Sequence, residues 1–164
     1  MTSLRDGGIA VDLPAGWDGQ IRAAGQSAPS TDAAARAAGA AEQAPSARVL
    51  HAASFALPAE RGDYGSGAVE RVGGSDVLVC LLEHEPEAAA TALFAREGIP
   101  RLTPGIFSPQ SMQRAIAGMA GSQHFFQVEG RPFCLYVVVG SWHTRGPLVR
   151  IADRVASSIR VSRA

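Results

Sequence analysis

Two apolar runs separated by a tight turn are the feature that most constrains the fold of this chain. The runs cover residues 125–128 and 133–139, and Glu129-Gly130-Arg131-Pro132 between them has the composition of a turn. In the second run both alternating sets of side chains are apolar, so a strand built from it must be covered on both faces. The pattern predicts a β-hairpin near the centre of a sheet.

The segments around this hairpin predict the rest of the architecture. Further strands are expected at 8–14, 20–22, 48–57 and 76–82, and a short tail follows at 159–161. Helices are expected from Pro86, from Ser108-Pro109 and over 147–158, where proline or an N-cap residue marks the start. Strands and helices do not alternate regularly, which favours an α+β class. We therefore expect a largely antiparallel sheet with helices on both faces, an α/β/α sandwich.

Chain length and local composition bear on domain organisation. The 164 residues are enough for one ordinary domain with its own core, so 1–164 is expected to form a single α+β domain. Residues 23–47 are mainly Ala, Gly, Ser, Pro and Gln and have almost no large side chains. A segment of this kind has little to bury, and we interpret it as a low-complexity, mobile insertion between two strands.

The charge balance and the hydropathy disfavour two classes of partner. The chain has 15 basic and 15 acidic residues, and every basic residue is arginine, scattered singly along the sequence. Nucleic-acid binding needs concentrated positive charge, so no nucleic-acid partner is expected. No apolar run is long enough to span a membrane, and the first residues lack the pattern of a signal peptide. We expect no membrane partner and a cytoplasmic location.

Motifs for catalysis are missing from the sequence. The segment Asp63-Tyr64-Gly65-Ser66-Gly67 is not a G-x-S-x-G nucleophile elbow, and no phosphate-binding loop or lysine is present. Cys80 and Cys134 lie in apolar runs without metal-knuckle spacing, which is typical of buried free thiols. We expect no cofactor, no metal and no catalytic residues. A weak alternative is a small site of Glu83, His84 and His143, if two strand ends meet at one edge.

The aromatic residues in loops are better candidates for a functional surface. Trp17 lies in a glycine-flanked turn, Tyr64 among flexible glycines, and Trp142 in a loop beside His143 and Arg145. Tryptophan and arginine are enriched at interface hot spots, so these five residues are predicted to contact a protein partner. The competing interpretation is that the two tryptophans cap the core.

The order of the elements resembles a known family. A strand ending in Leu13-Pro14-Ala15-Gly16-Trp17, a late hairpin over 126–139 and a closing helix over 147–158 are similar to Mog1/PsbP-like α/β/α sandwich domains, among them uncharacterised actinobacterial members. The resemblance implies binding of a protein partner or an accessory function, usually without catalysis. Many of those bacterial relatives are exported lipoproteins, whereas this chain has no lipobox cysteine.

Three functions follow from these observations. The first is a non-catalytic interaction or accessory domain that binds a protein partner through loops and a sheet edge or helix face. The second is a small enzyme or ligand-binding protein with a pocket near His84 and His143. The third is a structural subunit of a larger assembly. Whether the chain is an enzyme is left open by the sequence, with the balance toward no catalysis.

Overall fold

A computed structural model describes residues 1–25 and 47–163 of the chain. The strands are β1 (Thr2–Asp6), β2 (Ile9–Leu13), β3 (Asp18–Ala23), β4 (Arg48–Ala53), β5 (Val77–Glu83), β6 (Ala120–Val128), β7 (Arg131–Val139) and β8 (Arg160–Val161). One α-helix, α2 (Arg145–Ser157), lies in the described part of the chain. Single 3-10 turns occur at Val69–Arg71, Pro86–Ala90, Ala92–Phe94, Pro104–Ile106 and Pro109–Ser111.

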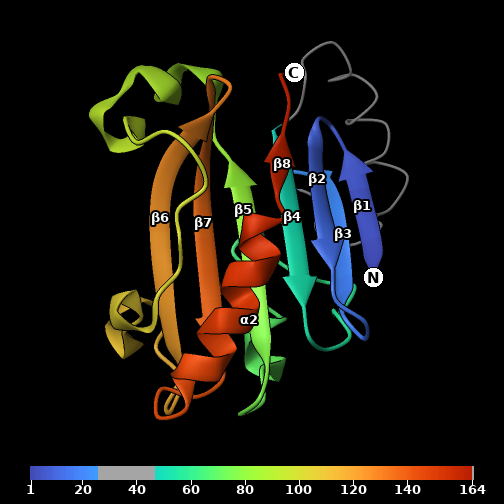
Figure 1. The fold of residues 1–164 in the computed structure, drawn as a ribbon, viewed down its shortest axis with the longest axis vertical. Helices are drawn as coiled ribbons and strands as arrows, with labels where there is room; N and C mark the ends of the chain where they lie inside the picture. The colour runs from blue at the N-terminus through green and yellow to red at the C-terminus, as the bar shows by residue number, and fades with distance from the viewer. Residues whose placement is uncertain (26–46, 164) are drawn as a thin grey trace.

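The strands form two antiparallel sheets. The large sheet has the order β3-β4-β5-β7-β6, and the small sheet has the order β1-β2-β8. Figure 1 shows α2 and the small sheet side by side in front of the large sheet. The described molecule is therefore mainly β.

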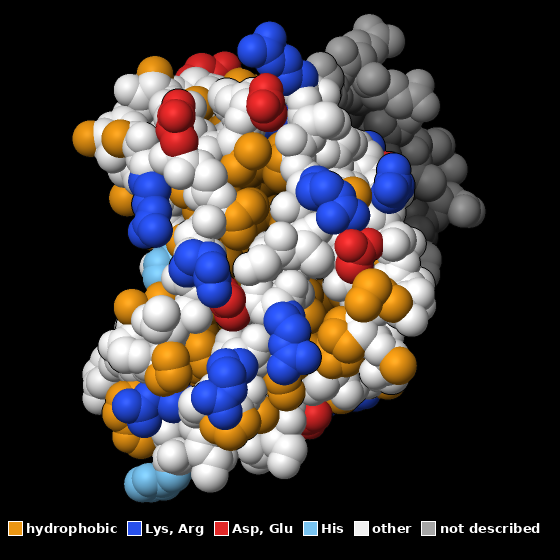
Figure 2. All heavy atoms as spheres, in the orientation of Figure 1, with side chains coloured by type: hydrophobic (Ala, Val, Ile, Leu, Met, Phe, Trp, Pro, Cys, Tyr) orange, Lys and Arg blue, Asp and Glu red, His pale blue; other side chains and the backbone are white. Residues whose placement is uncertain are grey.

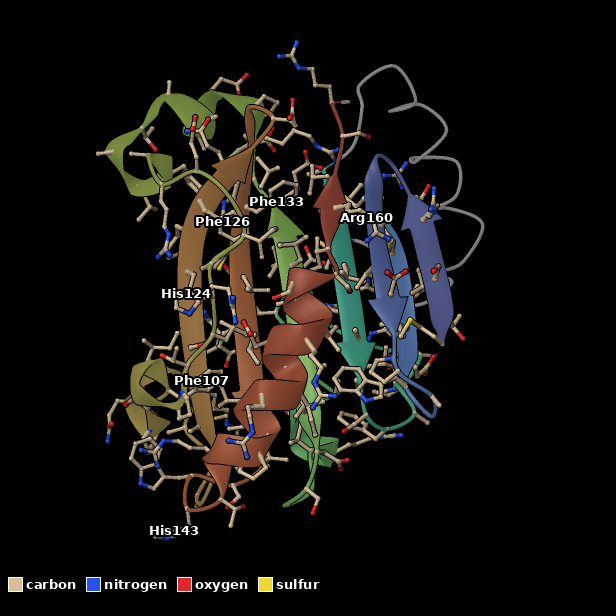
Figure 3. The ribbon with its side chains drawn as sticks, viewed as in Figure 1. Phe107, His124, Phe126, Phe133, His143 and Arg160 are labelled. Carbon is tan, nitrogen blue, oxygen red and sulfur yellow. The ribbon has the colours of Figure 1, made fainter. Side chains whose placement is uncertain are left out.

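The predicted hairpin is confirmed, but it lies at one side of the large sheet rather than near its centre, because β6 is an edge strand. Glu129 and Gly130 both have positive φ values, of 53° and 75°, and Val128 pairs with Arg131 across the turn. Two central residues with positive φ give the twist that a tight antiparallel hairpin needs. Strand β7 lies between β5 and β6, and all nine of its residues are buried. Figure 3 labels Phe126 and Phe133, whose rings stack across the hairpin at 6.0 Å.

Each face of the large sheet has a different cover. One face packs against the small sheet and α2, through residues such as Val11, Leu135 and Val149. The opposite face, which carries Cys80 and Tyr136, packs against the loop 54–72 and the segment 112–119. The predicted α/β/α sandwich is therefore wrong, because the second face is covered by loops with 3-10 turns rather than by helices.

The helices expected after Pro86 and Ser108 have a physical reason to be absent. None of the residues Pro86–Ala90 is buried, and Phe94 is the one buried residue of the turn that follows. Isolated helices this short are marginal in water unless an apolar stripe packs on a core. Ser108 does cap the next turn by accepting from the Gln110 N–H, but the helical bonding ends at Ser111. The helix expected at 147–158, in contrast, is confirmed as α2.

The amino-terminal part also differs from the sequence prediction. Strand β1 was not expected from the sequence. Leu4 is the one residue of this strand that packs on the core, and the others are exposed. The insertion predicted at 23–47 falls mostly on 26–46, which lie outside the described residues. At its ends, the Ala24 N–H donates to the Ala47 carbonyl at 2.7 Å.

Candidate functional site

The loop before α2 brings together three of the five predicted partner-binding residues. The Arg145 guanidinium lies 3.7 Å from the centroid of the Trp142 ring and donates to the carbonyls of Trp142 and Pro104. His143 is exposed at the tip of the same loop, and Figure 3 places it at the end of the molecule. Arg145 thus fastens the 3-10 turn Pro104–Ile106 to the start of α2, and its guanidinium is already engaged within the protein.

Arg145 should consequently be important for stability. Replacing it with alanine removes two hydrogen bonds and the stacking on Trp142, so we expect the free energy of unfolding to fall by about 2 kcal/mol. Chemical denaturation would measure the change. The conservative Arg145→Lys variant should recover less than half of the loss, because lysine cannot donate in the same fork. An alanine variant as stable as the original would show that the contacts are dispensable.

Trp17 and Tyr64 do not join the same surface. Trp17 is half-buried and packs on the core beneath α2 and the small sheet. Tyr64 packs on the opposite face of the large sheet, where its ring meets Tyr136 edge-on at 5.8 Å. Burial of the Tyr64 hydroxyl raises its pKa to about 12. The large sheet therefore separates Tyr64 from Trp142.

His84 and His143 lie at opposite ends of the large sheet. Strands β5 and β7 run antiparallel, with Glu83 opposite Phe133 and Val77 opposite Val139, so the end of β5 lies beside the start of β7. At about 3.3 Å per residue the two strand ends are about 20 Å apart. No pocket near both histidines can form in this arrangement.

Glu83 is occupied by other partners. Its carboxylate accepts from Arg131 at 2.7 and 2.9 Å and from the Arg48 backbone N–H at 3.0 Å. Within 1–25 and 47–163, no three His, Cys, Asp or Glu side chains gather into a group that could hold a metal ion. The weak alternative site of Glu83, His84 and His143 thus has no common location.

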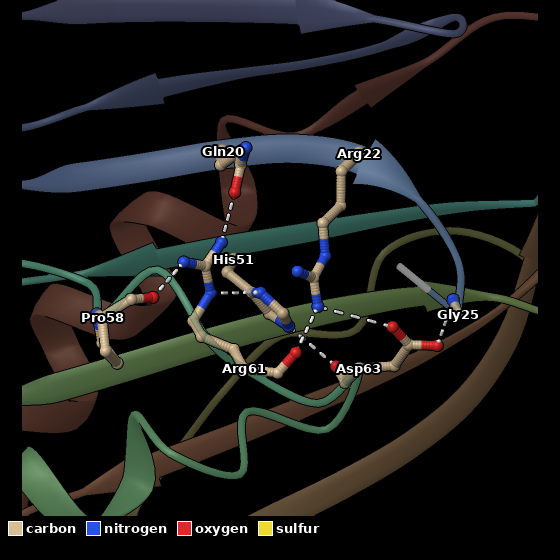
Figure 4. Close-up of polar contacts among 7 residues, drawn as sticks. All are labelled: Gln20, Arg22, Gly25, His51, Pro58, Arg61 and Asp63. Carbon is tan, nitrogen blue, oxygen red and sulfur yellow. Dashed lines mark hydrogen bonds and ion pairs between the residues drawn. The ribbon is translucent and has the colours of Figure 1, made fainter. Parts of the chain in front are cut away.

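A buried polar cluster, which the sequence did not predict, lies under the loop 54–72 (Figure 4). Arg61 is 5% exposed and donates to His51 Nδ1, to the Pro58 carbonyl and to Gln20 Oε1. Since Nδ1 of His51 accepts, the ring proton is on Nε2, which donates to the Asp63 carbonyl at 2.8 Å. We call the four residues Gln20, His51, Arg61 and Asp63 the loop-anchoring cluster.

Arg22 completes the attachment of the loop to the edge strand β3. Its guanidinium donates to the Arg61 carbonyl at 2.7 Å and lies 3.6 Å from the Asp63 carboxylate. The other Asp63 oxygen accepts from the Gly25 N–H at 2.9 Å. Every contact is internal, so the cluster binds a loop to the sheet rather than a ligand to the protein.

The titration behaviour of the groups around this cluster agrees with a structural role. Burial, together with the charges of Arg61 and Arg22, lowers the pKa of His51 to about 4. Burial also raises the pKa of the Cys80 and Cys134 thiols. Cys80 pairs with Tyr136 and Leu82 with Cys134, so the thiols are diagonal neighbours on one face, and both are free. Thiols with a raised pKa are poor nucleophiles.

The outer surface of α2 is the most distinctive exposed feature of the described molecule. Figure 2 shows arginine side chains over α2 and the segment beside it, interleaved with apolar side chains. We call this the α2 basic surface. It consists of Arg101, Ile106, Pro147, Arg150, Ile151 and Arg154.

Charge on the α2 basic surface is poorly balanced. Its acidic neighbour Asp153 accepts from Arg101 at 3.0 Å and from the Leu102 N–H at 2.8 Å, and the Asp153 side chain is 16% exposed. Arg150 and Arg154 are exposed and have no ion pair with any residue of the described ranges. An anionic group can therefore approach two unpaired guanidinium groups on α2, and Ile106, in the turn that contacts this helix, is 40% exposed.

Sequence reasoning placed Arg150 and Arg154 on the outside of the helix but assigned them no role. The available signal was their i, i+4 spacing, which puts two like charges side by side at a small cost to the helix. Arg101 and Ile106 could not be added from the sequence, because they lie in the connection between two expected helices, and nothing in the sequence places that connection beside α2. Two shallow hollows elsewhere, about 450 Å³ beside Arg5 and Arg160 and about 720 Å³ beside Glu129, include none of the five predicted residues.

Fold and surface together define a mainly β protein of two antiparallel sheets with a basic helical face. A scan of family models found no match to the chain, and searches of curated proteins and of solved structures returned no relative. The resemblance to Mog1/PsbP-like domains therefore stays a prediction from the sequence. No helix in the described part of the chain is long and apolar enough to cross a membrane.

Proposed function

We propose that this protein is a non-catalytic interaction domain that binds an acidic segment of a partner protein through the α2 basic surface. The observation that supports the proposal is the pair Arg150 and Arg154, exposed on one helix face without ion-pair partners among the described residues. Complementary charge steers association and selects partners. The apolar neighbours Ile106, Pro147 and Ile151 provide area for contact once the charges are matched.

The surface favours an acidic polypeptide over a nucleic acid. It carries two arginines on one short helix, unpaired within the described residues, and a third, Arg101, on the segment beside it, whereas nucleic-acid affinity depends on many phosphate contacts along a groove or stripe. An extended acidic segment needs fewer charges and gains from the apolar area. A cytoplasmic location is part of the proposal, as is the accessory role that the sequence resemblance implies.

A charge-reversal experiment tests the proposal. The probe is a fluorescent peptide of sequence Glu-Glu-Leu-Glu-Glu-Leu-Glu, titrated with the full chain at 0.15 M salt. We expect the Arg150→Glu/Arg154→Glu variant to bind it at least 10-fold more weakly, since two attractive contacts become repulsive. Fluorescence anisotropy measures the affinity.

The control variant is Arg71→Glu, which reverses an exposed arginine at the end of the turn Val69–Arg71, in the loop that covers the other face. It should change the affinity less than 2-fold. If both variants weakened peptide binding equally, the effect would come from the net charge of the protein, which would contradict the proposal. A duplex DNA probe that binds more tightly than the peptide would contradict it in favour of a nucleic-acid partner. If neither probe binds, the result contradicts the proposal and favours the alternative that the protein is a structural subunit of a larger assembly.

A further inference from the structure

The outer edge of β6 is held by other parts of the chain at its two ends only. Near its start, Gly121 and Ser108 exchange two backbone hydrogen bonds of 3.0 Å. Near its end, the Gln127 N–H donates to the Arg96 carbonyl at 2.8 Å and the Gln127 carbonyl accepts from Gly98 at 2.9 Å. Figure 1 shows the short turns of the two flanking segments at the upper and lower left of β6, with the middle of the strand between them.

The middle of this edge has unused hydrogen-bonding groups. Backbone groups alternate between the two sides of a strand, and those of Gly121 and Gln127 point away from β7. Gln123 and Phe125 therefore also direct their N–H and C=O groups outward. Neither N–H nor C=O of these two residues has a partner on this side within 1–25 and 47–163. Four backbone groups are thus available on the stretch of β6 between Gly121 and Gln127, which is about 20 Å long and which we call the window.

Two side chains on the same strand also lack hydrogen-bond partners in the described molecule. Ser122 Oγ and His124 Nε2 are buried and have no hydrogen-bond partner in the described molecule. Figure 2 shows the outline of the molecule indented at mid-height on this side, with a histidine at the indentation, where Figure 3 labels His124. Gln123, His124 and Phe125 are partly exposed, so the middle of the edge is not fully covered by the described chain.

The two sides of the window differ in chemistry. Phe125 is half-buried and packs edge-on against Phe94, with ring centroids 5.6 Å apart, and the neighbouring Leu93 is 58% exposed. On the other side, burial lowers the pKa of His124, and the positive charge of Arg96 lowers it further. Arg96 is exposed and has no ion pair with a described residue.

We propose that this window of β6 binds an extended segment of a partner protein as an added antiparallel strand. The occupant has an apolar–acidic–apolar sequence, with its apolar side chains beside Phe125 and Phe94 and its acidic side chain toward Arg96. Strand addition satisfies the four outward backbone groups, and the alternating side chains give specificity. This site is separate from the α2 basic surface, so either one can fail without the other.

A peptide with selective backbone methylation tests the proposal. The probe is acetyl-Thr-Val-Glu-Val-Thr-amide, added to the full chain while amide hydrogen exchange is followed by NMR. We expect exchange at Gln123 and Phe125 to slow at least 10-fold. N-methylation of the two valines, whose N–H groups face β6 in the added strand, should weaken binding at least 10-fold. N-methylation of the glutamate, whose N–H faces away, should change it less than 2-fold.

Protein variants provide a second readout. Gln123→Pro removes an outward N–H and should abolish the protection, whereas Gln123→Ala keeps the N–H and should bind as the original does. Arg96→Gln should weaken the glutamate peptide several-fold but leave a Thr-Val-Thr-Val-Thr peptide unchanged. Equal binding of the two methylated peptides, or unchanged exchange at Gln123 and Phe125, would overturn the proposal. Protection that rises with protein concentration alone would overturn it in favour of pairing between two copies of this chain.

Discussion

Replacing Arg61 with alanine should lower the free energy of unfolding by about 3 kcal/mol. The side chain is 5% exposed and donates to three acceptors, of which His51 Nδ1 and the Pro58 carbonyl have no alternative described donor. Losing a charged donor costs about 1.5–3 kcal/mol, and each buried acceptor left without a partner adds to this. Urea denaturation followed by tryptophan fluorescence would measure the difference.

The Arg71→Ala variant is the matched control for Arg61→Ala. Arg71 lies in the same covering loop, but it is exposed and makes no ion pair with a described residue. Its removal should change the stability by less than about 0.5 kcal/mol. If Arg61→Ala were no more disruptive than Arg71→Ala, the loop-anchoring cluster would not be what holds the loop on the sheet.

Mild acid should destabilise the protein through His51. The pKa of His51 is lowered from 6.5 to about 4 in the folded state, so in this range the unfolded chain binds more protons than the folded one. Stability is therefore complete above pH 6.5 and is lost as the pH falls from 6.5 toward 4. The full loss is on the order of 3 kcal/mol, of which about 2 kcal/mol falls between pH 6.5 and 5.

The His51→Gln variant isolates this effect. Glutamine does not titrate, so the variant should be less stable at pH 7 but should show a much flatter dependence between pH 6.5 and 5. A smaller slope should remain, because burial also lowers the pKa of His84 and His124. Denaturation midpoints measured at pH 7, 6 and 5 would give both slopes. Parallel slopes for the original and the variant would rule out His51 as the source.

Sequence reasoning correctly predicted those parts of the fold in which apolar side chains recur with the period of a strand or a helix. The doubly apolar run in β7 predicted a strand buried on both faces, and the apolar positions Leu148, Ile151 and Val155 predicted α2, although Ile151 is only half-buried. The second face was mispredicted, because prolines and N-cap residues marked helix starts where the chain forms only 3-10 turns, and Met112, Ile116 and Met119 pack on the sheet without a helix. Strand β1 was missed because its burial depends on packing of Leu4 alone.

The candidate sites depended on sheet register, which the sequence does not reveal. His51 meets Cys80, and Cys80 meets Tyr136, only because β4, β5 and β7 pair in one particular alignment. The same register places the end of β5 far from the end of β7, which separates His84 from His143. In contrast, the contact between Trp142 and Arg145 is local, at three residues apart, and their proximity could be predicted from the sequence.

Chemical-shift mapping tests the central claim most directly. Uniformly ¹⁵N-labelled full chain would be titrated with the acidic peptide at 0.15 M salt, and backbone amide shifts would be followed residue by residue. The account predicts that the largest changes fall on α2, with a second group around Arg101 and Ile106. Changes confined to the loop 54–72, or spread evenly over the exposed arginines, would contradict it.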